Sequence, residues 1–218
     1  MNPAVRRFPW TVGIGLLLLI LSLSLAFLLA KARATLEHRE SLPVLAQIAD
    51  FSLTNQNGAT VSLADLRGRV WIADIIFTTC PGPCLRVTRQ MKELQDGLST
   101  DNKTKLVSLT TNPDYDTPAV LKTYGMRNGS DTNRWMFLTG TKKELYNLAV
   151  DSLKLSAVEK KPEERTSPED LWVHSTIFVL VDKHAQLRGI YQTGGEDVSW
   201  PAEKRKLLAA VKQLEREP

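Results

Sequence analysis

Residues 70–84 read VWIADIIFTTCPGPC, an apolar run that leads directly into a pair of cysteines. The run from Val70 to Phe77 is rich in β-branched residues and is typical of a strand buried on both faces of a sheet. From Pro83 to Leu98 apolar residues recur at helical spacing, and a proline suits the first turn of a helix. The sequence therefore predicts a strand, an open loop and a helix, with both cysteines at the carboxyl end of the strand. Functional sites of α/β proteins form at this end of their strands.

The flanking sequence supplies the other elements of an α/β domain. Residues 51–54 and 60–63 alternate between apolar and polar side chains around Asn57-Gly58, which indicates a hairpin. Residues 155–172 are polar and contain proline, so we expect an insertion loop there. Further strands are expected at 105–111, 135–138, 175–181 and 186–191, and helices at 117–124, 141–150 and 201–215. The order β-α-β followed by β-β-α predicts one domain with a mixed sheet.

The N-terminal segment carries no charged residue from Phe8 to Ala30, a run of 23 residues. A helix of 21 residues covers about 31 Å, which is the thickness of a bilayer core. This length favours an uncleaved, single-pass anchor, because the apolar part of a cleaved signal peptide usually has about 7–15 residues. Small residues around Lys31 and Arg33 leave cleavage open as an alternative. A buried helix of a soluble protein is the third interpretation.

We therefore expect an anchor with its flanks at residues 1–34, a linker at 35–49 and a folded domain at 50–218. Positive charges on the two sides of the apolar run are nearly balanced and do not set its orientation. A pair of cysteines needs an oxidising or redox-managed compartment. On that ground we predict a protein of the cell inner membrane whose domain faces the periplasm.

Composition excludes several classes of protein. The formal net charge is +4, and the chain after its leader carries nearly equal numbers of basic and acidic residues. No basic surface for nucleic acid is expected from such a balance. Two cysteines are too few for a multi-bridge disulfide scaffold or a four-cysteine zinc site, and three histidines are too few for a histidine-rich metal protein.

The spacing of Cys80 and Cys84 suits soft-metal or redox chemistry. A helix N-terminus lowers the pKa of a neighbouring thiol, and both chemistries need the thiolate. Residues four apart on a helix have Cβ atoms about 5–6 Å apart. Such a pair can chelate one metal ion or, after a small adjustment, form a disulfide. The alternative is two buried small hydrophobic residues, or a simple structural disulfide.

Four blocks resemble the Sco/SenC family of membrane-anchored, thioredoxin-like copper proteins. Residues 77–84 match its Phe-Thr-x-Cys-Pro-x-x-Cys signature. Residues 112–118 are similar to its Asp-Pro-x-x-Asp-Thr-Pro block, and residues 138–141 to its Leu-Thr-Gly junction. Residues 174–179 resemble the His-Ser block that opens a strand, and the likeness covers residues 45–215 in order.

The resemblance implies a thioredoxin-like fold with an added N-terminal hairpin, and a copper site for Cu(I) or Cu(II). Its metal ligands would be Cys80, Cys84 and His174. The implied function is copper delivery to, or redox control of, the binuclear copper site of cytochrome c oxidase. The implied partners are the copper-site subunit of that oxidase and either another periplasmic copper chaperone or a thiol reductant.

The chain departs from the family pattern at three positions near this site. Leu85 stands where proline commonly follows the second cysteine, Asn112 where aspartate is usual, and Val173 where an acid often precedes the histidine. The last two departures remove negative charge. We expect them to affect partner docking or the orientation of the histidine.

The remaining candidates have simpler interpretations. The alternative to a metal ligand for His174 is a histidine at the edge of a strand, hydrogen-bonded to backbone. His184 is expected to be solvated in a hairpin turn. His38 lies near the membrane segment, and Met91 is expected in the core. Asp74 is either a salt-bridged core residue or a proton acceptor for a cysteine.

The rival class is a membrane-anchored thiol-disulfide oxidoreductase of the thioredoxin superfamily, with Cys80 and Cys84 as its redox pair. Strong members of that class have Cys-x-x-Cys and a cis proline opposite the cysteines. This chain has Cys-x-x-x-Cys, and Val173-His174-Ser175 stands where the proline is expected. A metallochaperone is therefore favoured over an enzyme, and the oxidoreductase stays as the alternative.

Overall fold

The computed structural model describes residues 10–37, 41–80, 83–101, 103–159, 161–164, 172–174 and 176–218. The chain divides into two compact units, residues 1–41 and residues 42–218. Each unit is described by itself below.

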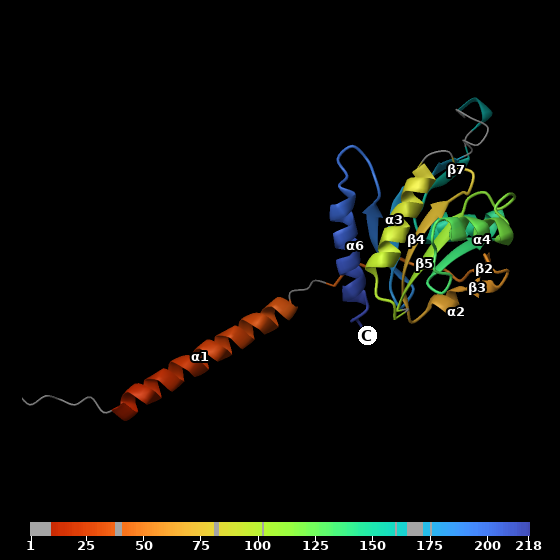
Figure 1. The fold of residues 1–218 in the computed structure, drawn as a ribbon. Coiled ribbons are helices and arrows are strands. Elements are labelled where there is room, and N and C mark those ends of the chain that lie inside the picture. The colour runs from red at the N-terminus through yellow and green to blue at the C-terminus, as the bar shows by residue number, and fades with distance from the viewer. Residues whose placement is uncertain are drawn as a thin grey trace, which may run out of the picture. The chain divides into compact units, whose positions relative to one another are not determined.

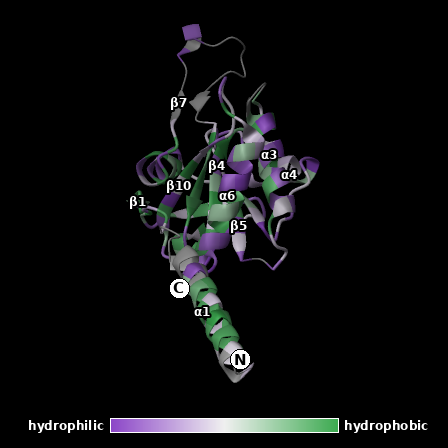
Figure 2. Cartoon of the chain, turned by 90° about the vertical axis from the view of Figure 1, so that its left-hand side faces the viewer, coloured by the Kyte–Doolittle hydropathy of each residue, from purple (hydrophilic) through white to green (hydrophobic). Residues whose placement is uncertain are grey.

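The first unit is the long helix α1, Trp10–Glu37. Its segment Gly13–Lys31 is long and apolar enough to cross a membrane, and none of that segment is buried against protein. Nineteen helical residues span about 28 Å, close to the thickness of a bilayer core. The side chain of Ser22 donates a hydrogen bond to the carbonyl of Leu19, which satisfies this hydroxyl within the helix. Figure 2 shows the helix as almost continuously hydrophobic.

The second unit is built on an eight-stranded mixed sheet in the order β1-β10-β9-β4-β5-β6-β2-β3 (Figure 1). Strands β4, β5 and β6 are parallel, and β9 lies antiparallel to β4. The bounds are β1 Ala46–Gln47, β2 Ser52–Asn55, β3 Thr60–Ser62, β4 Val70–Ile76, β5 Thr104–Thr110, β6 Trp135–Thr139, β9 Ile177–Val181 and β10 Gln186–Gln192. The predicted mixed sheet is confirmed.

Helices cover both faces of the sheet and make a three-layer α/β/α domain. On one face lie α3, Pro83–Gly97, α4, Pro118–Arg127, and α6, Trp200–Leu214. On the other face lie α2, Leu63–Leu66, α5, Lys142–Tyr146, and the π-helical turn η1, Asn147–Ser152. Every residue of β4 is buried, as expected for a strand covered on both faces. Figures 1 and 2 both show α3 and α6 side by side, and in Figure 2 α6 lies in front of the sheet.

The predicted N-terminal hairpin is present as β2 and β3, with Leu53 opposite Val61. The Asn55 side chain accepts hydrogen bonds from the backbone N–H groups of Asn57 and Ala59. Gly58 has a φ of 79°, a left-handed conformation that favours glycine. The hairpin extends the sheet by pairing β2 with β6.

Two sequence expectations were wrong in detail. The helix that begins after Thr141 does not stay α-helical to residue 150, because it changes into η1 at Asn147. The region 155–172 is not entirely loop. Its ends form a two-stranded sheet, in which β7, Ala157–Glu159, pairs antiparallel with β8, Trp172–His174. Between these two strands in the sequence, a short 3₁₀ turn, η2, forms at Pro162–Glu164.

Candidate metal centre

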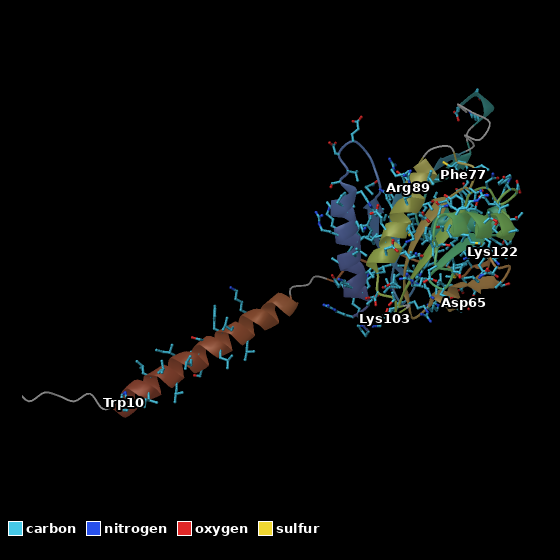
Figure 3. All side chains as sticks on the ribbon, viewed as in Figure 1. Trp10, Asp65, Phe77, Arg89, Lys103 and Lys122 are labelled. Atoms are coloured by element: carbon cyan, nitrogen blue, oxygen red, sulfur yellow. The ribbon has the colours of Figure 1, made fainter. Side chains whose placement is uncertain are left out.

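The two cysteines lie at the edge of the sheet where the central parallel strands end. In the pairing of β4 with β5, Ile76 stands opposite Thr110, so the loops after both strands leave from the same edge. The backbone N–H of Thr111 continues the ladder by donating to the carbonyl of Ile76. Figure 3 shows Phe77 at this edge and Lys103, before β5, at the opposite end of the domain. The cysteines therefore lie at the carboxyl ends of the parallel strands, where functional sites of α/β proteins form.

A tight turn carries the first cysteine. The backbone N–H of Cys80 donates to the carbonyl of Phe77 at 3.2 Å, which closes a turn over Phe77–Cys80. Helix α3 begins at Pro83, so Cys84 lies in its first turn. Cys80 is partly exposed, whereas Cys84 is 1% exposed and belongs to the core between the sheet and α3. The partner-accessible sulfur of the pair is therefore that of Cys80.

The two thiols contact each other directly. The hydrogen bond with Cys80, followed by burial and the charge on Cys80, raises the pKa of the Cys84 thiol. The Phe77 backbone opposes this effect, and the negative charge of Asp74 adds to it. The expectation that a helix N-terminus lowers the pKa of a neighbouring thiol is therefore wrong for Cys84, whose pKa the neighbouring sulfur and burial raise.

Two side chains beneath the thiols were not singled out in the sequence. Tyr124, on α4, shares a 2.8 Å hydrogen bond between its hydroxyl and that of Thr88 on α3. Burial raises the pKa of Tyr124, and negative charge on Cys84 and Asp74 raises it further. Asp74 itself is completely buried in β4. A signal for Thr88 was available, because it follows Cys84 by one helical turn.

The loop after β5 is fixed to the loop that carries Cys80. Asp116 is completely buried, and its carboxylate accepts hydrogen bonds from the hydroxyls of Thr78 and Thr110. Burial raises the pKa of Asp116, while those hydrogen bonds oppose the rise. By contrast, Asp114 in the same loop is exposed and forms a 2.5 Å ion pair with Lys142.

An open groove of about 390 Å³ borders the cysteine loop. Thr78 and Thr79 form one wall, and one face of α4 from Ala119 to Arg127 forms the other. Tyr115, which is about half exposed, also borders it. On the α3 side, Leu85 is 48% exposed just after Cys84. Polar and apolar side chains therefore both lie near the loop that carries Cys80.

The backbone of His174 ends β8 opposite Ala157, three residues before β9 begins. Its side chain lies outside the described part of the structure. The start of β9 is tied to α3, because the carbonyl of Thr176 accepts bonds from the N–H and the hydroxyl of Thr193, at 3.0 and 2.5 Å. The carbonyl of Thr193 in turn accepts a 2.8 Å bond from the side chain of Gln90 on α3. The His174 segment is thus linked to the helix that carries Cys84.

The described side chains bring together the two cysteines and no larger set. Among them, no three His, Cys, Asp or Glu residues cluster as metal ligands would. His184 is exposed in the turn at the far end of the sheet, as expected, and its ring nitrogen lies 3.0 Å from the carbonyl of Pro218. Met91 is fully buried in the core, which confirms its expected role. His38 lies outside the described residues.

The family model described as SCO1/SenC matches residues 40–209. The chain belongs to the SCO1/SenC family. The match covers the cysteine turn, the Asp116 loop and the His174 segment together. The predicted resemblance and the thioredoxin-like fold are confirmed.

Relatives of this SCO1/SenC protein align with it along most of their length. The SCO1 protein homolog of Bacillus subtilis is 33% identical over 162 residues, covering 72% of this chain and 81% of that protein. A Stutzerimonas stutzeri protein, named as a candidate copper-binding protein, is 32% identical over 152 residues, covering 68% and 70%. The solved structure of BsSco is 30% identical with a TM-score of 0.68, covering 83% of this chain and all of that one. It is described as having a disulfide switch, in a family of cytochrome c oxidase assembly proteins.

Proposed function

We propose that this SCO1/SenC protein is a copper-binding assembly factor for cytochrome c oxidase. It would deliver copper to the binuclear copper site of the oxidase, or control the redox state of the cysteines there. The observation that carries the proposal is the direct contact between the sulfurs of Cys80 and Cys84 at the carboxyl edge of the sheet. The name of the Stutzerimonas stutzeri relative points to the same metal.

The residues of the edge fit copper by the chemistry of their donor atoms. Two thiolates are soft ligands that select Cu(I), and one imidazole added to them makes a three-coordinate site that accepts Cu(II) with a water. We assign the imidazole to His174. Support comes from its place three residues before β9, a strand that pairs with β4, the strand that leads to Cys80.

Copper binding would be linked to protons. The raised pKa of Cys84 means that its thiol is protonated at neutral pH, so binding as a thiolate must release that proton. Copper affinity should accordingly fall as the pH is lowered. The partly exposed Cys80 would be the sulfur through which copper or a partner thiol arrives.

The proposed setting is the outer face of the inner membrane. Helix α1 would serve as a single-pass anchor, with the domain in the periplasm. The proposed partners are the copper-site subunit of the oxidase and either a second periplasmic copper chaperone or a thiol reductant. The description of BsSco supports the oxidase as the target.

A second candidate function is thiol-disulfide exchange. The contact between the Cys80 and Cys84 sulfurs also suits a reversible disulfide, and BsSco is described as having a disulfide switch. In that reaction the thiolate of Cys80 attacks a partner disulfide and releases one partner thiol. Cys84 then displaces the second, so two electrons and two protons leave the pair.

Substitution of the histidines tests the copper assignment. His174→Ala should weaken Cu(I) binding only partly, because both thiolates remain, but should weaken Cu(II) binding strongly and change the thiolate-to-copper absorption band. His184→Ala is the matched control and should change neither. An unchanged Cu(II) spectrum in His174→Ala, with a changed one in His184→Ala, would show that the wrong histidine was assigned. If neither variant changes it, the site is the cysteine pair alone and thiol-disulfide exchange becomes the favoured function.

A further inference from the structure

A carboxylate from the neighbouring loop clamps the turn that carries Cys80. Asp116 accepts two hydrogen bonds from Thr78: one from its backbone N–H at 3.2 Å and a shorter one from its hydroxyl. Thr78 is the second residue of the Phe77–Cys80 turn, and the carbonyl of Phe77 accepts the N–H of Cys80. The contact is therefore made to the backbone of the turn itself, two residues before the sulfur.

The same carboxylate joins the ends of two strands. The hydroxyl of Thr110, the last residue of β5, donates to Asp116 at 2.5 Å and accepts the N–H of Asn112 at 2.9 Å. Three donors thus converge on one completely buried side chain. A buried donor left without its acceptor costs about 1–3 kcal/mol. This cost applies in full to the buried Thr110 and only in part to Thr78, which is partly exposed, so the bonds favour one position of the turn relative to β5.

We propose that Asp116 is a positioning residue that sets how readily Cys80 and Cys84 form their disulfide. A disulfide requires Cβ atoms about 3.5–4.5 Å apart and a narrow range of dihedral angles. Cys84 is fixed by α3 and the core, so the position of Cys80 decides how often the pair meets this geometry. The clamp at Thr78 restricts that position. The inference rests on the proposed function only in taking the two cysteines as a reactive pair.

The test is the equilibrium of the full chain, in detergent and without copper, with glutathione. Oxidation removes two electrons and two protons from the pair and converts one glutathione disulfide into two glutathione thiols. The fraction of disulfide is measured by alkylating the free thiols and determining the mass of the protein by mass spectrometry. This readout does not depend on copper or on any oxidase.

Thr78→Val removes one donor to Asp116 and nearly preserves shape, and Thr78→Ser restores the hydroxyl. Thr78→Val and Asp116→Asn should each lower the equilibrium constant for disulfide formation at least tenfold, which corresponds to a reduction potential about 30 mV higher. Thr78→Ser should stay within about twofold of the unmodified chain. Asp114→Asn, in the same loop but exposed and paired with Lys142, should leave the constant unchanged.

A second control distinguishes the proposed positioning role of Asp116 from a general loss of stability. Val181→Ala removes methyl groups from the core at the carboxyl end of β9, away from the cysteine loop. This variant should lower the melting temperature without changing the equilibrium constant for disulfide formation. If Thr78→Val keeps the equilibrium constant of the unmodified chain, the proposal is overturned, whether or not Asp116→Asn folds. If the unmodified chain itself forms no disulfide at any glutathione ratio, the redox part of the proposed function fails instead.

Discussion

The two cysteines differ in what surrounds their sulfur atoms, and this difference predicts an order of reaction. Cys80 is partly exposed, whereas Cys84 is buried and its pKa is raised by its hydrogen bond with Cys80 and by burial. At pH 7 iodoacetamide should therefore modify Cys80 at least about tenfold faster than Cys84. Because a thiol with a raised pKa ionises only in alkaline solution, the rate at Cys84 should climb with pH beyond pH 9. Peptide mass spectrometry after timed alkylation measures both rates.

The unfolded chain in denaturant is the control for this order, since there both thiols should react alike. Faster modification of Cys84 than of Cys80 in the folded protein would contradict the assignment of the accessible sulfur.

Asp74 supplies negative charge to the same site from inside β4. Its charge adds to the raised pKa of Cys84, so Asp74→Asn should lower that pKa. The alkylation rate of Cys84 at pH 9 should rise several-fold, provided that circular dichroism shows an intact fold. The control is Asp182→Asn, which removes a buried acid at the far turn, where it pairs with Arg188, and should leave the rate at Cys84 unchanged. A rate at Cys84 that falls in Asp74→Asn would mean that Asp74 acts as a proton acceptor for the thiol rather than as a fixed charge.

At the scale of the element, β7 and β8 hold the backbone of His174. Glu159 pairs with Trp172 and Ala157 with His174, and residues 160–171 join these two strands in the sequence. Replacing them by Asn-Gly, the sequence of a tight turn, should preserve the pairing and the Cu(II) absorption band. Replacing Val158 by proline should disturb the pairing and shift that band. The idea fails if the shortened chain loses the band while keeping its fold.

Sequence patterns correctly predicted the elements that depend on interactions between residues close in sequence. The all-apolar run of β4 and the capping box of Thr141 with Glu144 both appear as expected, the box with bonds of 3.0 and 3.2 Å. The change into η1 and the pairing of β7 with β8 were missed. Both elements make contacts distant in sequence: the hydroxyl of Ser152 in η1 accepts the N–H of Ala49, and Ala157 in β7 pairs with His174 in β8.

The candidate site was predictable to the same degree. Cys80 and Cys84 stand out because their spacing carries a chemical meaning. The clamp by Asp116 does not, because its partners Thr78 and Thr110 lie 38 and 6 residues away in the sequence. Only the parallel pairing of β4 with β5 brings them to one edge.

At the scale of the whole molecule, the apolar helix predicts how the protein partitions. Segment Gly13–Lys31 is long enough to span a bilayer, so the chain should remain in the membrane pellet after alkaline carbonate extraction. A chain that begins at Leu42, the first residue of the second compact unit, is the matched control and should be soluble. Release of a fragment whose N-terminus lies near Ala34 would show that the segment is cleaved instead.

The central claim is that the reduced pair Cys80 and Cys84 binds copper. The direct measurement is the Cu(I) content of the full chain in detergent, by titration against a chromogenic Cu(I) chelator under anaerobic conditions. We predict one tightly held Cu(I) per reduced chain, strong loss of affinity in Cys80→Ser and in Cys84→Ser, and none held by the disulfide form, because thiolates are the ligands. Equal Cu(I) binding by the oxidised and reduced chains, or undiminished binding by the two serine variants, would contradict the claim.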